Sequence, residues 1–219
     1  LLWDMDPSTY DNGPTFTDAS GNEATITIAS PSAVVTQPSL HHDGTADYMV
    51  SAKWSLPVPV SAYTAVNTAS WTSNDRIFDG TNGSSGGAMF QTGTTPDISI
   101  AGSSVLGPVA SPLPLNTRGI MLGLFNSTSS EIRKNKGTAV TGTVGTAGLD
   151  GITYGCGRSV SQFGNLLEIE TLIYDTLAHD TATQDTVMDY LGQNNTIDLT
   201  QGSLFRPGGV DSYLRPGGV

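Results

Sequence analysis

The chain of 219 residues contains short stretches in which apolar and polar residues alternate. Ala24, Ile26 and Ile28 are separated by threonines, and this period of two is typical of a strand with one buried face. Similar stretches recur between clusters of turn-forming residues. They cover residues 48–53, 61–68, 98–100, 131–133, 139–143 and 166–174. The pattern predicts an all-β fold of many short strands, with the loosest region, over 79–107, holding one or two of them.

Two details refine this strand pattern. Residues 119–125, Gly-Ile-Met-Leu-Gly-Leu-Phe, are apolar on both faces and predict a central strand. An Asn-Lys-Gly sequence at 135–137 predicts a hairpin turn between two strands. Arg133, Lys134 and Lys136 surround this turn, and we expect them to be solvated at the tip of the hairpin.

One segment near the C-terminal end predicts a helix. Thr181 and Gln184 fit a capping box, in which a hydroxyl and a side-chain amide satisfy backbone N–H groups of the first turn. Gly192 is expected to end the helix. The residues expected on its apolar face are Val187, Tyr190 and Leu191.

Composition and charge narrow the class of protein. The chain has 26 glycines and only 13% charged residues, which is typical of turn-rich β proteins rather than of disorder. Its net charge of −11 argues against a nucleic-acid partner, which would need a cationic surface. No run of about 18 apolar residues occurs, so no membrane span is expected. At this length we expect one domain over residues 1–200 and an extended arm over 201–219.

The single cysteine, Cys156, leaves no partner for a disulfide within these residues. It follows a strand-like run and has no histidine in a matching motif. We therefore expect a buried structural thiol rather than a nucleophile.

Four segments in order resemble the concanavalin A-like, laminin G-like domains. Residues 16–22, Phe-Thr-Asp-Ala-Ser-Gly-Asn, resemble a signature of that family near its start, with Phe16 in place of the usual Trp. Residues 42–48 resemble a later segment, with His42 in place of Phe, and 152–155 match a late strand. Residues 170–191 resemble the strand and short helix that close the domain. The resemblance implies a two-sheet antiparallel jelly-roll sandwich.

That family includes glycan-binding proteins, retaining glucanases and structural modules, so the fold alone does not give the function. The glucanases carry the pattern E-x-D-x-x-E on one strand. Here Glu168 and Glu170 occupy its first two acidic positions, and Ile173 stands in place of the last. Two carboxyls two apart on a strand share a face at roughly the separation that a retaining hydrolase needs. Because the pattern is incomplete, we expect no catalytic residues and no enzyme.

Two tryptophans are candidates for a glycan-binding surface. Trp54 and Trp71 border a Pro-rich strand region, and Asn74 and Asp75 follow the second of them closely. A sugar site of this kind needs an exposed aromatic side chain beside fixed polar groups. The alternative for each tryptophan is packing into the core or anchoring of a loop.

Acidic loops could hold calcium, which takes six to eight oxygen ligands. The candidates are Asp43, Asp47, Asp79 and Asn82. No EF-hand loop is present, and turn formation alone would also explain these residues.

The C-terminal segment contains a duplication, Leu-Phe-Arg-Pro-Gly-Gly-Val at 204–210 and Tyr-Leu-Arg-Pro-Gly-Gly-Val at 213–219. Such a sequence cannot form a core of its own, and we expect residues 203–219 to dock as an arm on a neighbouring protein. A flexible linker is the alternative. The side chains expected to dock are Phe205, Arg206, Pro207, Val210, Tyr213, Leu214, Arg215, Pro216 and Val219.

Together these features favour a non-enzymatic structural or adhesion protein outside a cell, such as a decoration or fibre-like subunit on a bacteriophage virion. Its expected partners are virion or lattice proteins through the arm, a glycan, and other copies of the chain. A secreted bacterial carbohydrate-binding module and a glucanase-type hydrolase using Glu168 and Glu170 are the alternatives.

Overall fold

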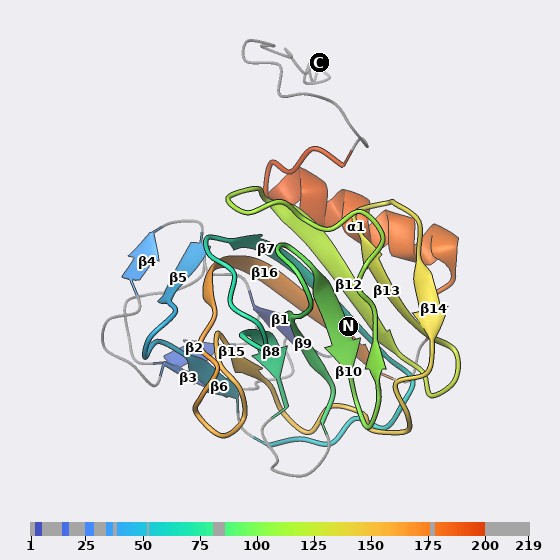
Figure 1. Cartoon of the computed structure of the whole chain (residues 1–219), viewed down its shortest axis with the longest axis horizontal. Coiled ribbons are helices and arrows are strands. Elements are labelled where there is room, and N and C mark those ends of the chain that lie inside the picture. The colour runs from blue at the N-terminus through green and yellow to red at the C-terminus, as the bar shows by residue number, and fades with distance from the viewer. Residues whose placement is uncertain are drawn as a thin grey trace, which may run out of the picture.

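The protein is an all-β sandwich of two antiparallel sheets with one helix, as the computed structural model in Figure 1 shows. This architecture confirms the predicted fold class. The structure describes residues 3–5, 15–17, 25–28, 34–36, 39–51, 53–80, 86–175 and 178–199.

The first sheet has eight strands and includes the longest strand that the structure describes, β16. In spatial order it contains β14 (Val140–Gly142), β13 (Ser130–Lys134), β12 (Gly119–Phe125), β7 (Val60–Thr68), β16 (Asn165–Asp175), β5 (Ser39–Asp43) and β4 (Val34–Thr36), while β1 (Trp3–Met5) also pairs with β16. The strand and hairpin patterns over 61–68, 119–125, 131–143 and 166–174 all lie in this sheet.

The second sheet also has eight strands, most of them shorter. In spatial order it contains β11 (Val105–Leu106), β10 (Ile98–Ala101), β9 (Ala88–Gln91), β8 (Arg76–Asp79), β15 (Thr153–Tyr154), β6 (Met49–Ser51), β3 (Thr25–Ile28) and β2 (Thr15–Thr17). The region over 79–107 thus contributes three complete strands, β9 to β11, rather than the one or two expected.

The main core lies between the two sheets. Met121 and Phe125 of β12 pack there with Phe78 of β8 and Tyr154 of β15. The rings of Phe78 and Phe125 meet nearly edge to face with centroids 6.4 Å apart, and those of Phe78 and Tyr154 with centroids 6.3 Å apart. Burial of these large side chains is the main term that stabilises the sandwich.

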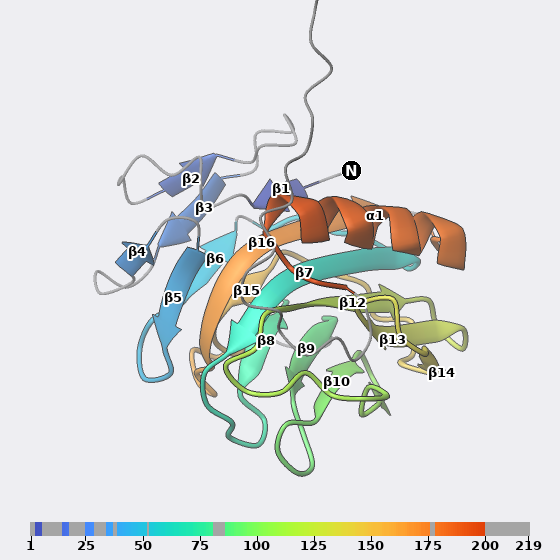
Figure 2. The same cartoon turned by 90° about the horizontal axis from the view of Figure 1, so that it is seen from above.

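A second core covers the outer face of the first sheet. Helix α1 (Thr181–Asn194) lies along that face over β7 and β12, as Figure 2 shows. Beneath it, Ile120 and Leu122 of β12 pack against Met188 and Leu191 of the helix. Strand β12 is therefore covered on both faces, which explains why its sequence is apolar throughout.

The ends of α1 differ from those expected. Asp180, one residue before Thr181, caps the helix by accepting a 2.8 Å hydrogen bond from the Thr183 backbone N–H. The helix continues past Gly192 to Asn194, and Asn195 forms the C-cap. On the apolar face Met188 takes the place expected for Tyr190, which is 48% exposed.

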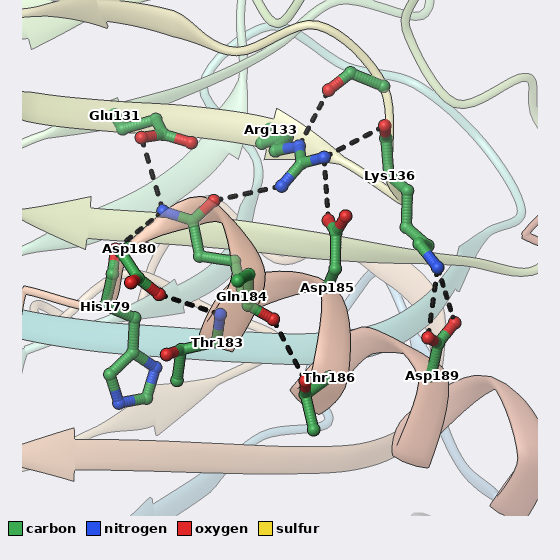
Figure 3. Close-up of polar contacts among 12 residues, drawn as sticks. Glu131, Arg133, Lys136, His179, Asp180, Thr183, Gln184, Asp185, Thr186 and Asp189 are labelled. Atoms are coloured by element: carbon green, nitrogen blue, oxygen red, sulfur yellow. Dashed lines mark hydrogen bonds and ion pairs between the residues drawn. The ribbon is translucent and has the colours of Figure 1, made fainter.

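Two of the basic residues around the β13–β14 turn, Arg133 and Lys136, contact the helix (Figure 3). Arg133 is only 5% exposed. Its guanidinium donates to Gln184 Oε1 at 3.0 Å and pairs with Asp185 at 2.8 Å. It also donates to the carbonyls of Lys136 at 2.9 Å and Gly137 at 2.7 Å. The expectation of a solvated basic turn was therefore wrong for Arg133, because the turn lies beside α1.

Replacement of Arg133 tests this attachment. Arg133→Ala should lower the free energy of unfolding by about 2–3 kcal/mol, because it leaves Gln184, Asp185 and two carbonyls without their donor. The matched control is Lys136→Ala, which removes an exposed pair with Asp189 and should cost no more than about 1 kcal/mol. Urea unfolding of both variants measures the difference, and equal losses would contradict the attachment role of Arg133.

Candidate functional site

The two carboxyl residues of the hydrolase alternative lie on β16 with an irregularity between them. Glu168 pairs with Val66 of β7 and Glu170 with the adjacent Ala65, so the register shifts by one residue at this point. Such a bulge breaks the strict alternation of side chains along a strand. The expectation that both carboxyls share one face rested on that alternation.

Glu170 lies beneath the end of α1 and is 3% exposed. Asn195, the C-cap residue, donates from Nδ2 to Glu170 Oε2 at 2.6 Å and to the Leu191 carbonyl at 3.0 Å. The carboxylate thus connects the outer face of the first sheet to the end of the helix. This arrangement gives Glu170 a structural role.

Three rings cluster near the start of the helix. Tyr63 of β7 places its hydroxyl 2.8 Å from Nδ1 of His179, and the His179 and Tyr174 rings meet with centroids 4.6 Å apart. Burial raises the pKa of Tyr63 and lowers the pKa of His179. The cluster therefore favours a neutral histidine beside the helix.

This histidine should make stability depend on pH. Because the pKa of His179 is lower in the folded protein, the unfolded chain takes up the proton first as the pH falls below about 6.5. The His179 contribution is complete above that pH and declines below it until the folded pKa is reached. In His179→Asn, which cannot titrate, the free energy of unfolding should fall less between about pH 7 and pH 5. If the free energy of unfolding of the wild type and of His179→Asn fell equally with pH, this contribution of His179 would be ruled out.

The loop after β7 holds three of the glycan-binding candidates. Gln91 of β9 fixes this loop, because its side chain accepts from the Thr72 N–H at 2.8 Å and donates to the Ser70 carbonyl at 2.8 Å. Trp71, between these two contacts, is half-buried. The Trp71 loop, residues 69–75, is therefore held at both sides of its aromatic residue.

The two polar candidates close this loop. Asn74 is exposed, has a positive φ of 75°, and donates its backbone N–H to the Gln91 carbonyl at 2.8 Å. Asp75 is half-buried, and burial raises its pKa. Trp71, Asn74 and Asp75 thus belong to one fixed loop, with Asn74 the most accessible to a ligand.

Trp54 does not join them. It lies six positions before Val60, the first residue of β7, whereas Trp71 follows Thr68, the last one. Trp54 also packs against the core between the sheets. Because a strand of this length extends about 3.3 Å per residue, the two tryptophans lie toward opposite ends of β7 and do not form one surface.

The calcium candidates have other contacts. The Asp43 carboxylate accepts from the Thr45 N–H at 2.7 Å, the Thr45 hydroxyl at 2.5 Å and the Ala46 N–H at 3.1 Å. These bonds, led by the one to the Thr45 hydroxyl, hold the pKa of Asp43 well below its usual range. Asp47 is buried, with its carbonyl 3.4 Å from the His42 ring nitrogen.

Asp79 is buried and pairs with two arginines, Arg76 at 3.4 Å and Arg158. Asn82 lies outside the described residues. Among the residues that are described, no three His, Cys, Asp or Glu side chains lie close enough together to hold a metal ion.

Sequence patterns missed an aromatic pair on the second sheet. Tyr48 precedes β6 and Phe163 precedes β16, and their rings meet with centroids 6.3 Å apart at a tilt of 54°. Both are half-buried. The two residues are far apart along the chain, and no motif connected them.

Three further expectations concern the cysteine, the C-terminal arm and a membrane span. Cys156 is fully buried, as predicted, and burial raises the pKa of its thiol to about 12. The arm over 203–219, with all its docking candidates, lies outside the described residues. In the part of the chain that is described, no helix is long and apolar enough to cross a membrane.

No protein-family model matches the chain, and no curated protein does. Solved structures do match in fold. A mutant sialidase of Trypanosoma rangeli with trans-sialidase activity superposes with a TM-score of 0.66 at 12% identity over 89% of this chain. The match covers 33% of that sialidase, so the chain spans about a third of its length.

Two further solved structures give similar matches. Domain 4 of AbnA, an extracellular arabinanase of Geobacillus stearothermophilus solved with arabinotriose, matches with a TM-score of 0.59 at 14% identity, over 86% of this chain and 98% of that one. The binding domain of botulinum neurotoxin serotype D/C matches with a TM-score of 0.61 at 11% identity, over 87% and 52%. At these identities the comparisons show the fold alone: a β-sandwich like those of lectins and glycosidases.

Proposed function

We propose that this chain is a non-enzymatic glycan-binding module of a virion surface, attached to its assembly by the C-terminal arm. The observation that carries the non-enzymatic part is the burial of Glu170 beneath α1, where Asn195 binds its carboxylate. A retaining glycosidase needs two accessible carboxyls at close range on one open face. On the outer face of the first sheet, the helix occupies that position.

The glycan-binding part rests on the Trp71 loop. It offers a half-buried indole beside exposed polar residues, and Gln91 fixes it before any ligand arrives. A preorganised loop of this kind loses less conformational entropy on binding. The net charge of −11 favours neutral over acidic glycans at long range.

Attachment through the arm rests on the sequence. The repeated Arg-Pro-Gly-Gly-Val supplies a cation, a rigid proline and apolar residues in duplicate, without a core of its own. Two copies of one short docking sequence on a chain would also strengthen attachment through multivalency.

One observation favours a second candidate, a module of a secreted bacterial glycanase. The AbnA domain, which belongs to an extracellular arabinanase, is matched over 98% of its length. In that case the glycan-binding surface would be the same and residues 201–219 would connect to a further domain.

Glycan binding is tested on an array of neutral and acidic glycans. The wild-type chain should bind a neutral glycan, and Trp71→Ala should weaken that binding by about tenfold or more, as loss of a central aromatic contact does. The control is Thr128→Ala, in an exposed turn between β12 and β13, which should bind like the wild type. A blank array would overturn the proposal, and release of reducing sugar from a bound glycan would show an enzyme instead.

Deletion of residues 203–219 tests the attachment. The shortened domain should keep its fold and glycan binding but fail to enter the assembly with which the full chain co-purifies, as native mass measurement would show. Incorporation of the shortened chain would contradict the docking role of the arm. Attachment of the full chain to a catalytic domain rather than to virion proteins would favour the secreted module.

A further inference from the structure

A hairpin before β16 carries a valine in a conformation that glycine ordinarily adopts. The Gly157 N–H donates to the Ser161 carbonyl at 2.7 Å and the Val160 N–H to the Gly157 carbonyl at 2.8 Å, which closes a three-residue loop. Val160 ends this loop with φ at 53°. A β-branched residue is strained in this region, where such loops favour glycine. Val160 is also 51% exposed, so burial in the fold does not compensate for the strain.

The fold holds this strained hairpin firmly. Arg158 donates from its guanidinium to Asp79 and, at 3.0 Å, to the Gly86 carbonyl. At the other side of the loop, the Arg76 N–H donates to the Gln162 carbonyl at 3.0 Å. A strained, exposed residue whose surroundings fix it in place is a common feature of ligand-contacting sites.

The hairpin stands beside a second fixed turn. The rings of Tyr48 and Phe163 connect the two segments, and the Asp43 carboxylate fixes the turn before Tyr48 through its bonds to Thr45 and Ala46. In Figure 2 the connection from β5 to β6 lies next to the loop that leads into β16. Two fixed turns thus border an aromatic pair.

We infer that Tyr48, Phe163 and Val160 form a binding surface for a neutral oligosaccharide, separate from the Trp71 loop. We call these three residues, with the exposed Gln162, the Tyr48 surface. The inference rests on the proposed glycan-binding function and gives it a second location. Half-exposed rings and an aliphatic side chain can pack against the C–H faces of sugar rings, while the amide of Gln162 can bind hydroxyls.

Charge and size select this class of ligand. The charged groups next to the Tyr48 surface are already paired within the fold, Arg158 with Asp79 and Asp43 with its own turn. An anionic ligand would therefore displace existing contacts. Three partly exposed apolar side chains also offer much less than the roughly 1,000 Å² expected of a stable protein interface, whereas they match one or two sugar rings.

Because Val160 is strained, its replacement by glycine should raise the stability of the protein and lower its affinity for the ligand. Val160→Gly in the full chain should raise Tm by about 2–4 °C, because glycine adopts a positive φ without strain. It should also weaken binding of neutral gluco-, manno-, xylo- or galacto-oligosaccharides about tenfold at the Tyr48 surface, through loss of the isopropyl contact, while binding at the Trp71 loop is unchanged. Isothermal titration with this panel and thermal unfolding measure the two effects.

The matched control is Ser127→Gly in the turn after β12, where φ is 53° as well. Its described backbone bonds are made by the carbonyl, which glycine keeps. This variant should gain stability and leave affinity unchanged. Equal losses of affinity in both variants, or full affinity in Val160→Gly, would overturn the Tyr48 surface.

The outcomes also separate this inference from the function it rests on. Loss of binding in Trp71→Ala with full affinity in Val160→Gly would leave the proposed function standing without the second surface. If the chain bound only acidic oligosaccharides, the Tyr48 surface would likewise be overturned, while the proposed glycan-binding function would stand. A wild-type chain that binds no glycan at all would overturn both.

Discussion

The structure depends on covering the first sheet on both faces. In β12, Met121 and Phe125 pack between the sheets, while Ile120 and Leu122 point the other way. A two-layer sandwich would expose this second set to water, at a cost of about 25 cal/mol per Å² of apolar surface. Helix α1 removes that cost by covering the outer face. The domain therefore has three layers where the helix lies.

Polar contacts decide where the helix sits on that face. Arg133 connects the β13–β14 hairpin to the helix near its start, and Glu170 binds Asn195 at its end. Apolar packing alone is non-directional, whereas buried hydrogen-bonded groups tolerate few positions. The same contacts engage Arg133 and Glu170, two buried polar residues beneath the helix. The ligand contacts that we propose lie on loops, which agrees with the general tendency of binding residues to lie on connections held by a rigid scaffold.

Local patterns predicted eight of the sixteen strands that the structure describes, and less of the detail. Alternation over residues 25–28 and 166–174 and the apolar run over 119–125 correspond to β3, β16 and β12, because side-chain period directly reflects which faces are buried. Strands such as β9 and β11 were missed because they have only four and two residues, too few for a period of two to be recognised. The N-cap lies one residue before the predicted one, because the Asp180 side chain accepts from the Thr183 N–H.

The candidate sites were harder to predict, because each depends on contacts that no local pattern contains. The bulge between Glu168 and Glu170 comes from pairing with β7. The Tyr48–Phe163 pair joins two distant segments, and Arg133 is buried only because a helix much later in the chain lies over it. The position of Trp71 on a fixed loop depends on Gln91 of a different strand. Residue types suggested the chemistry, while the fold decided which residues meet.

The late position of the helix in the chain affects how the protein is made. Strands β7 and β12 leave the ribosome well before residues 181–199, which supply Met188, Leu191 and Ile197 to the outer core. During synthesis the face carrying Ile120 and Leu122 therefore stays uncovered until the last part of the domain emerges. Exposed apolar sheet surface of this kind promotes aggregation and recruits chaperones. Premature termination just before the helix would release a chain whose first sheet is complete but has one apolar face exposed to water.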